Sequence, residues 1–188
     1  MIAIDRDKKI HGRQLAITTY AYGSDAVAVE GRLTDNRHVT TYYFSDGQPR
    51  PPGVVHDLVI RMVVKGPELV IEDIDADMET VPRKDCREIA DALKKVIGMK
   101  IQAGFTERVK ARVGGAKGCT HLVTLLLAMA PAAVQGAWSA VARQPVDPAK
   151  YSGAALRFLE NTCWVWRSDG ELMEETREKL AQATPSAG

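Results

Sequence analysis

One glycine-rich segment, residues 114–122, brings a thiol and an imidazole close together. It reads Gly-Gly-Ala-Lys-Gly-Cys-Thr-His-Leu, so Cys119 precedes His121 by two residues. The apolar run that follows predicts a helix, and a helix N-terminus presents unpaired amides and the positive end of the helix dipole. Both favour the thiolate, which is the form of cysteine that binds metals and attacks electrophiles. We therefore predict that Cys119 and His121 converge on one ligand; an unreactive, buried Cys119 fits the spacing equally well.

Further donors elsewhere in the chain could complete a site with four ligands. Cys86 lies on the apolar stripe of a predicted helix, and His56 enters a predicted strand beside Asp57. Thiolate and imidazole together suit zinc or an iron–sulfur centre. The predicted metal ligands are Cys86, Cys119, His121 and His56. Cys163 is the alternative fourth ligand, and Asp57 is expected to orient His56 from behind. Core packing of the cysteines and a structural hydrogen bond to His56 are the competing interpretations.

The candidate residues lie on predicted strands in the first part of the chain and on predicted helices after them. Segments with β-branched, partly alternating residues and glycine or proline turns between them predict strands at 14–20, 26–33, 58–64 and 69–74. Apolar residues at helical spacing predict helices at 84–97, 104–113 and 121–135. Cys163–Arg167 resembles a strand, Ser168–Gly170 a hairpin turn, and 171–182 a helix. The fold class is therefore α+β, with an N-terminal antiparallel β-meander, a three-helix segment and a C-terminal β-hairpin with a terminal helix.

Length and composition fit a single globular domain. The chain has 188 residues, of which 45% are hydrophobic and 26% charged, as is usual for soluble proteins. We predict an N-terminal arm at 1–12, one α+β domain at 13–182 and a disordered tail at 183–188.

The charge balance and the targeting signals of the sequence indicate which binding partners and which cellular compartment to expect. With 25 basic and 24 acidic residues, the chain lacks the basic excess of a nucleic-acid-binding domain. Its longest apolar stretch, Leu122–Val134, is shorter than the roughly twenty residues of a membrane span, and no secretory signal is seen. Three cysteines without an export signal favour reduced thiols. We expect a cytoplasmic protein with no nucleic-acid or membrane partner; a protein partner or a homodimer stays open.

A set of short motifs is spread over most of the chain. They are His56-Asp57, Pro82 to Cys86, Ile97 to Ile101, Gly104 to Thr106, Gly114 to Leu122 with Leu125-Leu126, Ala132 to Gln135, and Cys163 with Arg167 to Gly170. Together they resemble a bacterial family, domain of unknown function 2889, from about Gly12 to Glu175. Gly-Cys-Thr-His-Leu is the most specific motif. The chain departs from the family pattern at Val81–Asp85, where an aromatic is expected, and in its charged C-terminal end. The resemblance implies no activity.

A second resemblance is architectural. An extended pair, a cysteine before a helix, and a glycine turn carrying cysteine and histidine before another helix are similar to the iron–sulfur scaffold proteins. On this resemblance Cys86 is the first loop thiol, and Cys119 with His121 forms the late ligand pair. The scaffolds' glycine–cysteine–glycine loop and a further cysteine are missing here.

Three functions follow as hypotheses. The first is a metal-binding or iron–sulfur-binding accessory protein, favoured because the cysteines and histidines coincide with the motif positions. The second is an enzyme with Cys119 as nucleophile and His121 or His56 as its base. The third is a non-catalytic binding or structural module with buried thiols. Whether the protein is an enzyme is left open by the sequence.

Overall fold

A computed structural model describes residues 1–143, 156 and 159–183. The chain divides into two compact units, Met1–Ala140 and Val141–Gly188, called here the N-terminal and the C-terminal unit. Residues 184–188 of the predicted tail lie outside the described residues. The predicted boundaries of arm, domain and tail stay predictions.

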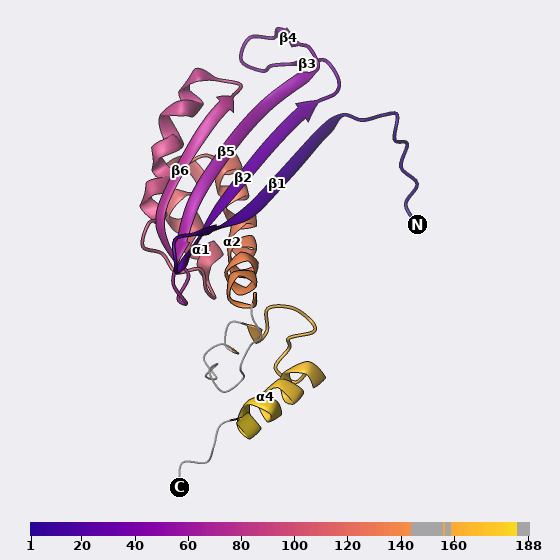
Figure 1. Cartoon of the computed structure of the whole chain (residues 1–188). Helices are drawn as coiled ribbons and strands as arrows, with labels where there is room; N and C mark the ends of the chain where they lie inside the picture. The colour runs from indigo at the N-terminus through magenta and orange to yellow at the C-terminus, as the bar shows by residue number, and fades with distance from the viewer. Residues whose placement is uncertain (144–155, 157–158, 184–188) are drawn as a thin grey trace. The chain divides into compact units, whose positions relative to one another are not determined.

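The N-terminal unit is built on an antiparallel meander, as predicted. The strands are β1 (His11–Tyr22), β2 (Ala26–Arg37), β3 (Thr41–Tyr42), β4 (Pro49–Arg50), β5 (Gly53–Lys65) and β6 (Val70–Thr80). The main sheet has the order β1-β2-β5-β6, and β3 pairs with β4 in a small separate hairpin (Figure 1). The four long strands match the four predicted ones and are longer, β1 and β5 at both ends and β2 and β6 at their C-terminal ends. The α+β class and the meander are therefore confirmed.

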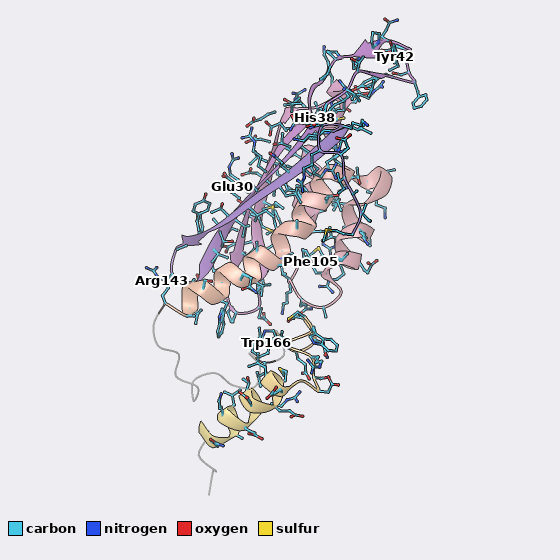
Figure 2. All side chains as sticks on the ribbon, turned by 90° about the vertical axis from the view of Figure 1, so that its right-hand side faces the viewer. Glu30, His38, Tyr42, Phe105, Arg143 and Trp166 are labelled. Carbon is cyan, nitrogen blue, oxygen red and sulfur yellow. The ribbon has the colours of Figure 1, made fainter. Side chains whose placement is uncertain are left out.

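Strand β2 shows why only one face of the sheet carries the core. Side chains alternate between the two faces of a strand, and Val27, Val29 and Leu33 are buried whereas Glu30 and Arg32 are exposed. The helices cover the inner face, and Glu30 lies on the opposite, outer face (Figure 2). The outer face is lined by ion pairs between neighbouring strands.

Three helices follow the sheet, which confirms the predicted helical segment. They are η1 (Lys84–Val96), α1 (Phe105–Val113) and α2 (Thr120–Val141), with a short η2 (Gly115–Lys117) between the last two. The first, η1, is a 3₁₀ helix, and it buries Leu93 and Val96 of the predicted apolar stripe together with Ala92. Pro131 lies inside α2, which continues past it and past its predicted end at residue 135.

Helix α2 lies close against the inner face of the sheet. A Cβ atom on Gly31 of β2 would come within 2.6 Å of the Met129 sulfur, so a larger residue here would have to displace the side chains of α2 that pack on the sheet. Further along the helix, Thr19 of β1 donates a hydrogen bond from Oγ1 to the carbonyl of Ala132 at 3.2 Å. Among the described residues, α2 is the one helix long and apolar enough to span a membrane, a property that core helices share. These contacts fix α2, and so its first turn, above β1 and β2.

In the described part of the C-terminal unit, α4 (Glu171–Ala183) confirms the predicted terminal helix. The predicted C-terminal β-hairpin is wrong. Cys163–Arg167 forms a turn instead, because the amide of Trp166 bonds to the carbonyl of Cys163 at 3.1 Å and so uses locally the groups that a strand would offer. Among residues 159–183 no strand is found. The predicted turn at Ser168–Gly170 is present, but it leads into α4.

Candidate metal centre

The centre begins with a carboxylate and an imidazole on adjacent strands. Asp35 of β2 and His56 of β5 are direct partners in the antiparallel register. The two-residue period that buries Leu33 also turns Asp35 to the inner face, where its side chain is only 2% exposed. Asp35 Oδ2 lies 3.1 Å from His56 Nδ1. A buried aspartate thus faces a histidine at the end of the apolar core.

A second imidazole reaches the same carboxylate from α2. The turn before this helix is tight, because a Cβ atom on Gly118 would lie 2.2 Å from the carbonyl oxygen of Val113. The helix begins two residues later at Thr120. This start places the His121 ring on the His56 ring, with centroids 3.8 Å apart and planes at 30°. His121 Nε2 lies 3.5 Å from Asp35 Oδ2.

Strand β1 adds two basic side chains on the other side of the carboxylate. Arg13 is the register partner of Asp35 and donates two hydrogen bonds, from Nε to Oδ1 at 2.7 Å and from Nη2 to Oδ2 at 2.8 Å. His11, half exposed, places its Nε2 3.6 Å from Asp35 Oδ1. The hydrogen bond from Arg13 lowers the pKa of Asp35, so the carboxylate is ionised at neutral pH.

Both inner histidines are uncharged at neutral pH. Burial, the largest cause in each case, lowers the pKa of His56 and the pKa of His121 below the ordinary 6.5. The negative charge of Asp35 acts in the opposite direction on both rings but does not outweigh burial. A neutral imidazole is the form that binds a metal ion.

These shifts predict how the stability of the metal-free protein depends on pH. As the pH falls from about 7 to about 5, the unfolded chain protonates its histidines before the folded chain protonates His56 and His121, so the free energy of unfolding decreases. Asp35 stays ionised in this window, because its pKa is lowered. Thermal melts across the window should show a falling midpoint. A double variant, His56→Gln with His121→Gln, should fall less steeply; equal slopes for both proteins would contradict the assignment.

Asp35, His56 and His121 form a group that could hold a metal ion. One ligand atom from each side chain lies within 4.8 Å of the other two. In the described part of the chain, no other set of three or more His, Cys, Asp or Glu side chains meets this condition. Two imidazoles and one carboxylate, with further coordination positions open, suit zinc or ferrous iron.

The predicted ligand set is thus only partly brought together. His56 and His121 meet, as predicted. Cys119, partly buried, has its sulfur 3.8 Å from His121 Nδ1 but is not part of the three-residue group. Cys86 packs against the hydrophobic core instead, because the apolar stripe of η1 faces the sheet. Cys163 is exposed and belongs to the C-terminal unit. The described residues therefore contain no cysteine cluster for an iron–sulfur centre.

The predicted role of Asp57 is wrong, and the carboxylate beside His56 was missed. Asp57 follows His56 directly in β5, so it points to the outer face, where Arg32 binds it at 2.7 and 2.5 Å. The carboxylate beside His56 is that of Asp35, with Oδ2 3.1 Å from His56 Nδ1. A signal for it was present, since extending the predicted strand at 26–33 by one more period places residue 35 on the buried face.

The geometry is also compatible with the predicted cysteine-dependent enzyme. Cys119 Sγ, His121 and Asp35 form a series in which the imidazole lies between the sulfur, at 3.8 Å, and the carboxylate, at 3.5 Å. Nucleophile, base and orienting carboxylate follow this order in cysteine-dependent enzymes. Catalysis by Cys119 with His121 stays a prediction.

Comparison with known families adds one finding. A family model described as "Protein of unknown function (DUF2889)" matches residues 11–135. A search of curated proteins and a search of solved structures each gave no match. The matched span contains every side chain of the centre, from His11 to His121.

Proposed function

The chain belongs to the DUF2889 family, and we propose that its N-terminal unit binds one divalent transition-metal ion through Asp35, His56 and His121. Zinc fits this ligand set best, since it accepts imidazole nitrogen and carboxylate oxygen without redox chemistry. The role that follows is that of a metal-binding accessory protein. Three protein ligands leave one tetrahedral position for water or for a ligand from another molecule.

The observation that carries the proposal is the spacing of the ligand atoms. Asp35 Oδ2 lies 3.1 Å from His56 Nδ1 and 3.5 Å from His121 Nε2. In a tetrahedral zinc site with bonds of about 2.0 Å, neighbouring ligand atoms are separated by about 3.3 Å. One distance is slightly shorter and the other slightly longer than that value. The three side chains could therefore bind an ion with little movement of the backbone.

Arg13 is compatible with an ion at Asp35. Each carboxylate oxygen has two lone pairs, and Arg13 uses one on Oδ1 and one on Oδ2. The second lone pair of Oδ2 faces His56 Nδ1 at 3.1 Å, and it is freed for the metal when His56 takes the tautomer with its proton on Nε2, which also frees the Nδ1 lone pair. Arg13 therefore acts on the ion indirectly, by orienting the carboxylate and keeping it ionised, as partners behind a metal ligand commonly do.

Binding does require the two rings to turn. The rings of His56 and His121 are stacked at 3.8 Å, and the lone pairs of stacked imidazoles run side by side, not toward one point. A rotation of each ring about its Cβ–Cγ bond lets both nitrogens face the ion. The ion can enter from the side of β1, where His11 is half exposed.

Equilibrium dialysis against zinc, followed by elemental analysis, tests the proposal. The wild-type protein is expected to bind one zinc ion per chain at neutral pH, because its two inner imidazoles are neutral and its carboxylate is ionised. The Cys119→Ser variant is expected to bind the same amount, since its sulfur is not a ligand. Zinc content of the wild type no higher than that of the dialysis buffer would refute the proposal.

A further inference from the structure

The two edges of the main sheet are protected very differently. On the β6 edge, the backbone of Ile71 is already bonded to Met99 and Gly98, and Val70 forms a bridge with Lys100. The strand is also interrupted by irregular register with β5. It carries five acidic residues, Glu72, Asp73, Asp75, Asp77 and Glu79. Charges, irregular register and covering segments are the usual means of preventing edge-to-edge pairing.

Between residues 14 and 22, the β1 edge has none of these features. Its register with β2 runs without interruption from His11 to Tyr22. Residues 14–22, Gln-Leu-Ala-Ile-Thr-Thr-Tyr-Ala-Tyr, contain no charge and no proline. Among the described residues no strand other than β2 pairs with β1. About half of the amides and carbonyls of this strand point away from β2 and are available to another strand.

The surfaces beside this edge are apolar as well. On β1, Leu15, Tyr20 and Tyr22 have exposed fractions of 43%, 52% and 53%. Helix α2, which Thr19 holds above β1, has no Lys, Arg, Asp or Glu along its whole length. Its most apolar stretch has a mean hydropathy of 1.5 but is only 39% buried. Apolar surface that runs along an unpaired strand edge is typical of an interface.

From these observations we propose that two copies of this chain pair through β1. The strands run antiparallel about a two-fold axis near Thr18, and the two four-stranded sheets form one continuous sheet of eight strands. In this register Ala16 faces Tyr20 of the second copy, and the uncharged segment 14–22 of each chain lies against the same segment of the other. A second copy is the occupant because the segment is complementary to itself in size: in this register Ala16 faces Tyr20 and Ala21 faces Leu15 of the second copy, and no like charges meet along the nine residues.

Sedimentation equilibrium of the 188-residue chain over a range of concentrations tests this interface. The wild type is expected to approach twice the chain mass of 20.5 kDa. The Thr18→Lys variant places two lysines together at the axis and should raise the dissociation constant at least about 100-fold. Within one chain the new lysine faces Glu30 across the sheet, so the fold should be retained, as circular dichroism can verify. Thr106→Lys makes the same change at an exposed position of α1 and should leave the dimer intact.

Hydrogen exchange locates the contact. In the wild type, the amides of residues 14–22 should exchange more slowly as the protein concentration rises, and in Thr18→Lys they should not. A wild type that stays monomeric, a dimer unaffected by Thr18→Lys, or exchange at β1 that is independent of concentration would each overturn the interface. All samples contain a chelator, so the result does not depend on metal binding.

Discussion

The variant His121→Ala is expected to bind zinc at least about 100-fold more weakly than the wild type. The change removes one of three ligands, and the remaining pair, Asp35 and His56, cannot enclose the ion from the side of α2. Because the ring of His121 also covers His56, its loss admits water to the carboxylate and weakens the remaining bonds. Calorimetric titration with zinc measures the effect.

His38→Ala is the matched control for this variant. His38 is an exposed histidine at the end of the sheet near the β3–β4 hairpin (Figure 2), and it lies outside the ligand group. Its removal should leave the zinc affinity unchanged. If His121→Ala and His38→Ala bound zinc equally well, His121 would not be a ligand and the centre would have to be abandoned.

The largest loss of stability is expected from Leu125→Ala. Leu125 is fully buried in α2 and lies against Gly31 of β2, where helix and sheet are in close contact. Truncating a buried leucine removes apolar contacts and leaves a cavity that the close packing around Gly31 cannot fill. The free energy of unfolding should fall by about 2–5 kcal/mol, as measured by urea denaturation.

Val141→Ala provides the comparison at the end of the same helix. Val141 is 54% exposed, so its truncation should change the free energy of unfolding by less than about 1 kcal/mol. Similar losses for both variants would show that α2 is not packed against the sheet as described. The position of His121 over His56 would then lose its structural basis.

The fold was largely predictable because its signals are local. The alternation in β2 and β5 and the helical spacing in η1, α1 and α2 each depend on neighbouring residues only. The C-terminal hairpin failed for the opposite reason. A segment such as Cys163–Arg167 becomes a strand only if another strand lies beside it, and nothing within the segment itself shows that. A local turn and the stacking of Arg167 on Trp164 prevailed.

The site was half predictable. Residue type and motif indicate His56 and His121, but proximity in sequence favours the wrong carboxylate, Asp57, as the partner of His56. Neighbouring residues in a strand point to opposite faces, so the side chain of Asp57 cannot contact that of His56. Asp35, twenty-one residues away in the sequence, lies on the same face as His56 and contacts it. The register between β2 and β5 decides which residues lie opposite each other. Because the two strands are far apart in the sequence, local patterns do not reveal this register. The chemistry of a thiol favours Cys119 as a metal ligand. In the structure, however, its sulfur lies beside Nδ1 of His121, whereas Asp35 lies beside Nε2 of the same ring.

Anomalous diffraction from crystals grown with zinc, recorded on both sides of the zinc absorption edge, tests the metal centre most directly. One strong anomalous peak is expected in each chain, within about 2.0–2.2 Å of Asp35 Oδ2, His56 Nδ1 and His121 Nε2, with the Arg13 guanidinium still bound to the carboxylate. A map without a peak between these three atoms, or with its peak at the Cys119 sulfur, would contradict it.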